Sequence, residues 1–392
     1  INLTRQSMAG GGDHYRSAYW GTITVGTPAA SFKVALDTGS GHLILPSTYC
    51  HSETCRAHQR YRRRQSTTAK DIDYDGAPVT PGAPRDQITV SFGTGEVVGV
   101  FVEDVMCLDN DAGIVALRDA SGLQRKMCTP LRTIMATAMS EEPFAAFEFD
   151  GVLGLGLSGL SQAPEFNFLH LMANSMNALG STSPHMFGVF LADGDEGSEI
   201  TIGGYDEHHM ETDLYWNPVV QPDLGHWMVQ IKSLRVDNQT VEFCRDGCKG
   251  VLDSGTSLLS VPTPAFPEIY ELLRHEADPV HRCNGLGPKL HMELENFTIT
   301  LEPSDFAQME PPLPGAGGFA GFEQKPDMCK PMLMSMEFPA PLGPKLFVLG
   351  EPVLRRYYSV FDSDPEAPRI GFSAAFHGIK EDDWADEDDE LP

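Results

Sequence analysis

The sequence predicts an all-β fold of two lobes related by a pseudo-twofold axis, and three observations support this. The 38 glycines and 29 prolines among 392 residues favour many short strands and turns over long helices. Apolar and polar residues alternate along most of the chain, as they do in half-buried strands. One block of residues also occurs twice, once in each half, so the two halves are expected to fold alike.

The expected elements follow from this alternation. We expect strands at residues 19–25 and 31–36, and a hairpin over 88–105 whose tip carries residues 92–96. Further strands are expected at 199–202, 214–220 and 227–236. Only two helices are expected, at 168–179 and at 264–276, the second with Thr263 as its N-cap. Residues 154–159 fit the spacing G-x-G-x-x-G, but they lack the flanking strand and long helix of a nucleotide site and are expected to form a tight turn.

The duplicated block defines two half-sites. It reads V-A-L-D-T-G-S-G-H-L-I-L-P at 34–46 and G-V-L-D-S-G-T-S-L-L-S-V-P at 250–262. Each copy is followed later by V-L-G, at 152–154 and at 348–350. Two diverged copies explain this better than coincidence. We therefore expect an N-terminal lobe over 1–188, a C-terminal lobe over 189–376, and an acidic, disordered tail over 377–392.

The chemistry of the block centres on Asp37 and Asp253. If an axis relates the lobes, the two carboxylates meet there, and like charges that close together share one proton. The ionised member can take a proton from a water molecule while the protonated member polarises a peptide carbonyl. This hydrolyses an amide with no covalent intermediate, metal or other cofactor. The flanking hydroxyls have two expected roles: Thr38 and Ser254 lock the loops together, and Ser40 and Thr256 donate to the outer carboxylate oxygens.

Charge and motifs exclude several classes of function. The formal net charge of −27 argues against binding to nucleic acid or an anionic membrane surface. No apolar run approaches the ~20 residues that span a bilayer. The 13 histidines include no H-E-x-x-H zinc motif, and His208 and His209 are expected in a solvated turn. The basic run at 60–64 is expected to be an exposed loop, with a processing site or an acidic-substrate docking patch as the alternatives.

The cysteines and sequons indicate a secretory route. Eight cysteines, none in a C-x-x-C pair, favour disulfides over a zinc or thioredoxin site. Three N-glycosylation sequons, at Asn2, Asn238 and Asn296, agree with this. The chain starts at Ile1 without methionine, so a processed form is expected. We expect it outside the cell or in an acidic, lysosome-like vesicle.

The sequence resembles the pepsin-like aspartic proteases along nearly its whole length. The segments that carry the resemblance are Y-W-G-T-I-T-V-G-T-P (19–28), I-T-V-S-F-G-T-G (88–95), F-D-G-V-L-G-L (149–155), C-R-D-G-C-K-G-V-L-D-S-G-T-S-L-L (244–259) and V-L-G-E-P-V-L-R-R-Y-Y-S-V-F-D (348–362). The resemblance implies two β-barrel-like lobes, an active-site cleft between them and a hairpin flap. It also implies a monomeric endopeptidase that cuts peptide or protein substrates between bulky apolar residues at acidic pH.

The resemblance assigns roles to individual residues. Asp37 and Asp253 become the catalytic pair. The implied substrate-binding positions are Gly39, Ile44, Phe92, Gly93, Thr94, Gly255 and Ser257. The implied disulfides are Cys50–Cys55, Cys244–Cys248 and Cys283–Cys329. Cys107 and Cys128 have no counterpart in the common pattern, and as the remaining two they are expected to pair.

Three positions depart from the family pattern. Phe92 stands where the flap usually carries Tyr, as in some protist members, and Ile44 stands where its Trp partner is usual. We expect these two residues to make an apolar contact that leaves no unpaired polar group, with a looser flap and a roomier S1 pocket. Glu351 replaces a common Asp and is expected to move the pH optimum. The alternatives to an active enzyme are an inactive homologue that binds a peptide or protein, and a structural subunit docked through the acidic tail.

Overall fold

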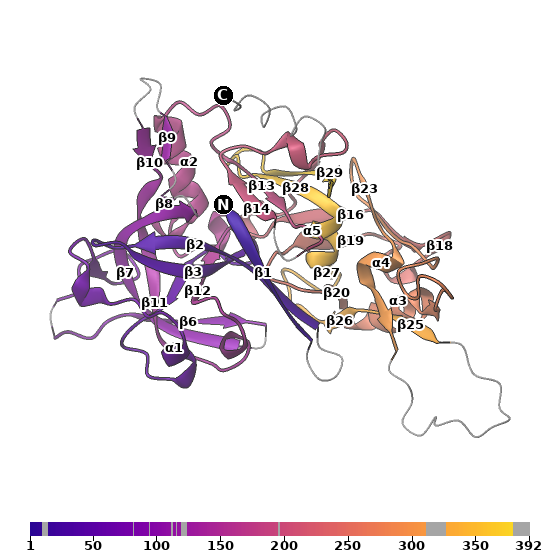
Figure 1. The fold of residues 1–392 in the computed structure, drawn as a ribbon, viewed down its shortest axis with the longest axis horizontal. Helices are drawn as coiled ribbons and strands as arrows, with labels where there is room; N and C mark the ends of the chain where they lie inside the picture. The colour runs from indigo at the N-terminus through magenta and orange to yellow at the C-terminus, as the bar shows by residue number, and fades with distance from the viewer. Residues whose placement is uncertain are drawn as a thin grey trace, which may run out of the picture.

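The computed structural model describes residues 1–9, 15–80, 82–93, 95–110, 113–114, 116–118, 124–194, 197–310 and 327–378. Strands dominate the two lobes, which lie side by side (Figure 1), so the predicted all-β, bilobal fold is confirmed. The acidic segment that follows residue 378 lies outside the described residues. Among the described residues, every helix is too short or too polar to cross a membrane.

The largest sheet joins the two lobes, because strands from both halves of the chain pair within it. Its path runs β15-β29-β28-β13-β14-β1-β2-β3-β12-β4-β11-β7-β5, and β6 and β8 pair with β7. The strands are β1 (Asn2–Ala9), β2 (Tyr15–Val25), β3 (Ala30–Asp37), β4 (Leu43–Pro46), β5 (Lys70–Ile72), β6 (Gln87–Phe92), β7 (Gly95–Asn110), β8 (Gly113–Ile114), β11 (Cys128–Met139), β12 (Gly151–Gly154), β13 (Met186–Phe190), β14 (Ser198–Ile202), β15 (Tyr215–Pro218), β28 (Tyr357–Asp362) and β29 (Arg369–Ala374).

Four smaller sheets complete the β structure. The two-stranded sheet pairs β9 (Ala116–Arg118) with β10 (Gln124–Lys126). The other three belong to the C-terminal lobe. The five-stranded sheet contains, in order, β16 (Met228–Ile231), β19 (Cys248–Leu252), β27 (Leu346–Leu349), β20 (Leu259–Pro262) and β26 (Leu333–Met336). The four-stranded sheet contains β18 (Gln239–Thr240), β17 (Ser233–Val236), β22 (Leu290–Glu293) and β23 (Thr298–Leu301). The three-stranded sheet contains β21 (His275–Glu276), β25 (Met328–Pro331) and β24 (Ala307–Met309).

Helices are short and lie between the strands. The α-helices are α1 (Glu53–Ala57), α2 (Phe168–Ala178), α3 (Phe266–Leu273), α4 (Pro303–Phe306) and α5 (Glu351–Arg356). The 3-10 turns are η1 (Arg63–Gln65), η2 (Phe144–Ala146), η3 (Ser158–Leu160), η4 (Pro164–Phe166), η5 (Glu207–His209), η6 (Pro222–Leu224), η7 (Glu242–Cys244) and η8 (Thr263–Ala265). The helix expected at 168–179 is confirmed as α2.

Two details of the expected elements are wrong. Thr263 does not cap the second helix: it begins the 3-10 turn η8, and α3 follows only at Phe266. The Thr263 hydroxyl instead accepts a hydrogen bond from Ser335 Oγ at 2.9 Å. The single strand expected at 227–236 is two strands, β16 and β17, because β16 pairs with β19 while β17 turns away to pair with β22.

The sequence duplication reappears as matching strand pairs. In the first half, β12 runs parallel to β3 and places Gly154 beside Asp37. In the second half, β27 runs parallel to β19 and places Leu349 beside Leu252. Both V-L-G strands also pair antiparallel with the strand that leaves the Asp loop, β4 or β20. Each Asp loop is therefore held between two strands of one sheet.

A buried core and four disulfides fix this frame. Trp227 is fully buried and bonds to both halves of the chain, since its Nε1 donates to Leu155 O at 2.7 Å and its carbonyl accepts from Leu252 N at 2.9 Å. The disulfides are Cys50–Cys55, Cys107–Cys128, Cys244–Cys248 and Cys283–Cys329, which is the expected pairing. The lobe boundary expected at 188 falls inside β13, and the two domain ranges stay a prediction.

Candidate active site

The two Asp loops meet, so that each glycine lies against the opposite aspartate. Gly39 N donates to Asp37 Oδ1 at 2.9 Å, and Gly255 N donates to Asp253 Oδ1 at 2.8 Å. A Cβ atom on Gly39 would lie 2.8 Å from Asp253 Oδ1, and one on Gly255 would lie 2.7 Å from Asp37 Oδ1. Only glycine leaves room for this approach. The structure therefore brings the predicted pair of carboxylates together.

Hydrogen bonds between Thr38 and Ser254 hold the two loops to one another. Each backbone N–H donates to the other residue's hydroxyl oxygen at 3.0 Å. The same hydroxyls donate onward to the opposite strand: Thr38 Oγ1 to Leu252 O at 2.9 Å, and Ser254 Oγ to Leu36 O at 2.7 Å. Four hydrogen bonds thus cross between the halves within three residues of the carboxylates.

The outer hydroxyls are not equivalent. Thr256 Oγ1 donates to Asp253 Oδ2 at 2.6 Å, as the sequence predicts. Ser40 Oγ is buried and makes no hydrogen bond of ordinary geometry with a described residue, but its interaction with Asp37 lowers the pKa of that carboxyl, so the expected donation to Asp37 stays a prediction. The Ser40 backbone is held in place, since Gly156 N donates to the Ser40 carbonyl at 2.8 Å and the Ser40 N–H lies 3.5 Å from Asp37 O.

The electrostatics of the pair favour a retained proton. Burial, and then repulsion from the Asp253 carboxylate, raise the pKa of Asp37 well above its ordinary value. The Ser40 hydroxyl, and then the Gly39 N–H, oppose this shift because they stabilise the charged form. The arrangement can therefore present one acid and one base side by side, which is what general acid–base chemistry on a water molecule requires.

The flap lies in the β6–β7 hairpin. Gly93 has a φ of 37°, in the left-handed region that favours glycine. Phe92 packs edge-to-face on Phe144, with ring centroids 5.4 Å apart, and belongs to the same apolar cluster as Ile44. The direct contact between Phe92 and Ile44 stays a prediction, and Thr94 lies outside the described residues. A different residue packed against this cluster, Trp20, has its Nε1 buried with no hydrogen-bond partner among the described residues.

Sequence reasoning missed a polar network behind the second loop. Glu351 N donates to Thr256 O at 2.9 Å, and the Glu351 carboxylate is buried. It accepts hydrogen bonds from residues of β1 and β2, namely Arg5, Ser17 and Tyr19. Ser257, expected to bind substrate, joins the network: its hydroxyl donates to Ser17 O at 2.8 Å and accepts from Ser17 N at 2.9 Å. Residues so distant in sequence leave no local signal of this contact.

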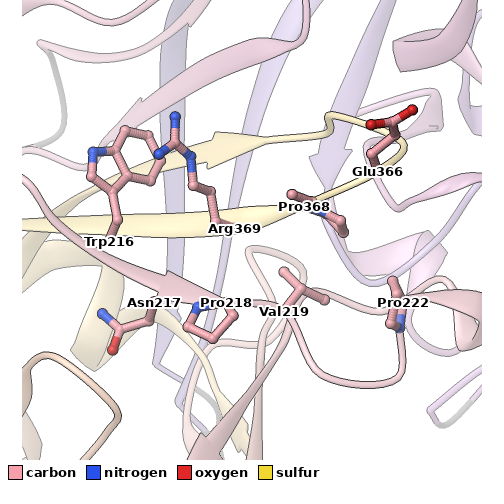
Figure 2. A pocket seen from close by; sticks show the side chains of 9 residues that line it. Trp216, Asn217, Pro218, Val219, Pro222, Glu366, Pro368 and Arg369 are labelled. Carbon is pink, nitrogen blue, oxygen red and sulfur yellow. The ribbon is translucent and has the colours of Figure 1, made fainter.

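A surface pocket lies away from the two Asp loops. A hollow of about 420 Å³ is lined by Trp216, Asn217, Pro218, Val219, Pro222, Glu366, Ala367, Pro368 and Arg369 (Figure 2). The Arg369 guanidinium stacks 4.2 Å from the Trp216 ring centroid and pairs with Asp362 at 3.0 Å. None of the predicted site residues lines this hollow, so it is separate from the carboxylate pair.

One group of the described residues has ligand atoms close enough to hold a metal ion: Glu199, Asp206 and His209 lie within 4.8 Å of one another. It includes neither predicted catalytic residue. His209 Nε2 lies 3.1 Å from Glu199 and, with its hydrogen bond, holds the pKa of Glu199 below its ordinary value. Both histidines lie in the turn η5 and His208 is exposed, as expected, but His209 is largely covered because its ring stacks on Phe190 at 3.9 Å.

Comparison with known proteins defines the class. A family model for eukaryotic aspartyl proteases matches residues 18–375, so the chain belongs to that family. It is a pepsin-like aspartic protease with the bilobal all-β fold. Cathepsin E of Mus musculus is 30% identical over 357 residues, covering 88% of this chain and 77% of that protein. Gastricsin of Cavia porcellus is 30% identical over 368 residues, covering 92% and 80%, and pepsin-3 of Oryctolagus cuniculus is 28% identical over 366 residues, covering 91% and 81%.

Proposed function

We propose that Asp37 and Asp253 are the catalytic pair of this endopeptidase and that they activate a water molecule between them. The observation that carries this proposal is the mutual approach of the two loops, in which a Cβ atom on either glycine would lie within 3 Å of the opposite aspartate. The ionised carboxylate takes a proton from the water, and the protonated one donates to the peptide carbonyl as the tetrahedral carbon forms. The raised pKa of Asp37 supports a pair that retains one proton at acidic pH.

The substrate is a peptide or protein in an extended conformation. The flap hairpin offers backbone groups that can pair with an extended chain as a further strand. Phe92, Ile44 and Phe144 make the flap side of the site apolar, which favours bulky apolar residues at the scissile bond. Gly39, Gly93, Thr94, Gly255 and Ser257 complete the proposed substrate contacts. The enzyme acts as a monomer in the secretory pathway, outside the cell or in an acidic vesicle. Asn2, Asn238 and Asn296 are exposed, which glycosylation there requires, and Asn296 Nδ2 must first give up its hydrogen bond to Trp216 O.

Cleavage of a quenched peptide library from pH 3 to pH 7 tests the proposal. Wild type should cleave peptides with apolar residues around the scissile bond, and a statine-type inhibitor should stop it. Asp37→Asn and Asp253→Asn should each lower kcat by at least about a thousandfold, because neither variant can form the acid and base pair. The competing function is a peptide-binding module. Equal behaviour of wild type and both Asn variants across the pH range would favour that alternative.

A further inference from the structure

Arg5 is connected to the loop that carries Asp253 through the buried carboxylate of Glu351. We propose that Arg5 is a positioning residue for peptide hydrolysis: by neutralising Glu351 it fixes the loop that carries Asp253. The inference rests on the proposed catalytic pair. Arg5 lies on β1 in the large sheet, opposite Tyr19 of β2, whereas Glu351 is the first residue of α5. The contact therefore joins the beginning of the chain to the half-site of the other lobe.

The ion pair between Arg5 and Glu351 is buried. The Arg5 and Glu351 side chains are 9% and 5% exposed, and an Arg5 guanidinium nitrogen (Nη2) donates to Glu351 Oε1 at 2.6 Å. Tyr19 OH donates to the same oxygen at 2.9 Å, and Ser17 Oγ donates to Oε2. Burial, and then the Glu351 carboxylate, raise the pKa of Tyr19, so its hydroxyl keeps the proton that it donates. The other nearby cation, Arg355, is half-buried and lies 3.8 Å from Glu351.

A short chain of contacts leads from this carboxylate to Asp253. Glu351 N donates to Thr256 O at 2.9 Å, and Thr256 Oγ1 donates to Asp253 Oδ2 at 2.6 Å. Gly350 packs so tightly here that a Cβ atom would lie 2.2 Å from Thr256 O. Any shift of Glu351 therefore moves the residue that holds the outer oxygen of Asp253.

Removing Arg5 changes the balance of charge at this point. A buried carboxylate that loses its cation is strongly destabilised and moves toward water or another partner. Because Glu351 is at the tightly packed start of α5, its movement drags the Thr256 carbonyl with it. A displacement of about 1 Å at reacting groups can cost about a hundredfold in rate. The ground-state contacts of the substrate with the flap and glycines would be retained.

The test compares Arg5→Met with Arg5→Lys and a matched control. We expect Arg5→Met to lower kcat by about 10- to 100-fold with KM within about twofold of wild type. Arg5→Lys keeps the charge and should retain kcat within about fivefold. Arg274→Met is the control, because it removes an arginine that donates two hydrogen bonds to Glu310 near the surface, and it should leave kcat unchanged.

The outcomes separate this inference from the proposed function. If wild type cleaves, Asp37→Asn does not, and Arg5→Met equals wild type in kcat, the positioning role is wrong while the catalytic pair stands. If wild type itself fails to cleave, the proposed function falls first. If Arg5→Met does not fold, Tyr19→Phe decides, since it removes one hydrogen bond to Glu351 and nothing else. A loss of at least about threefold in kcat at constant KM supports the role, and wild-type kcat overturns it.

Discussion

Thr38 and Ser254 bind each other symmetrically: the backbone N–H of each donates to the hydroxyl of the other at 3.0 Å. This exchange joins two loops that come from different lobes, directly beneath the carboxylates. It explains why the sequence carries a hydroxyl residue immediately after both aspartates, since one hydroxyl oxygen both accepts from a backbone N–H and donates to a carbonyl.

Loss of one partner in this exchange should reduce both stability and rate. Thr38→Val keeps the shape but leaves Ser254 N–H and Leu252 C=O without their partner. Two unsatisfied buried groups should lower the free energy of unfolding by about 2–4 kcal/mol, and kcat should fall about tenfold. Urea unfolding and steady-state kinetics measure both. Thr263→Val, which removes a hydrogen bond at the surface, is the control and should change neither.

A methyl group at the glycine of either loop should separate the carboxylates. Gly39→Ala places a Cβ atom 2.8 Å from Asp253 Oδ1, so the pair must move apart. We expect kcat to fall by at least about a hundredfold and a statine-type inhibitor to bind more weakly. Gly204→Ala is the matched control, since no atom lies within 4 Å of its added methyl group. Normal turnover by Gly39→Ala would contradict the mutual approach of the loops.

The raised pKa of Asp37 predicts a loss of both activity and stability as pH rises. The unfolded chain releases this proton near pH 4, whereas the folded protein keeps it to higher pH. The stabilising contribution is complete below about pH 4 and is lost as pH rises through the folded pKa. Asp37→Asn should therefore unfold with a flatter pH dependence than wild type above pH 4, in chemical denaturation. The exposed Asp213→Asn should keep the slope of wild type.

Protonation of His42 should lower the stability of the folded protein as pH falls. Burial lowers the pKa of His42 to about 4, and its Nε2 accepts a hydrogen bond from Gln162 N at 3.2 Å. The unfolded chain takes up a proton near pH 6.5, so stability falls as pH decreases from about 6.5 to about 4, by at most about 3 kcal/mol. His42→Asn can still accept from Gln162 and should remove most of this loss. The exposed His170→Asn should not, and an unchanged acid profile in His42→Asn would contradict the assignment.

The flap substitution should act only in combination. Phe92→Tyr adds a hydroxyl beside Phe144 and should change kcat/KM by less than about threefold, because Ile44 cannot accept a hydrogen bond from it or donate one to it. Adding Ile44→Trp supplies an indole N–H, so the double variant should differ from the sum of the singles. Kinetics on all four combinations measure the coupling. A large effect of Phe92→Tyr alone would reject this account.

The sequence predicted the parts of the site that occur in both copies of the repeated block. The repeated D-T-G and D-S-G blocks, each with a later V-L-G strand, predicted the paired strands and the roles of Thr38 and Ser254. Departures from this symmetry were not predictable from the repeat. Ser40 does not match Thr256: the Thr256 hydroxyl donates to Asp253 Oδ2 at 2.6 Å, whereas the Ser40 hydroxyl makes no hydrogen bond of ordinary geometry with a described residue.

By itself, the sequence determined the fold class, the two half-sites and the family, because repeated local patterns are encoded along the chain, and the resemblance to that family implied the disulfide pairs. Only the tertiary structure decided that Arg5, Ser17 and Tyr19 enclose Glu351 behind Asp253. Those residues have no common spacing with their partner. Their contact exists because the strands of both lobes close into one sheet, which buries the Glu351 carboxylate among one cation and two hydroxyl donors.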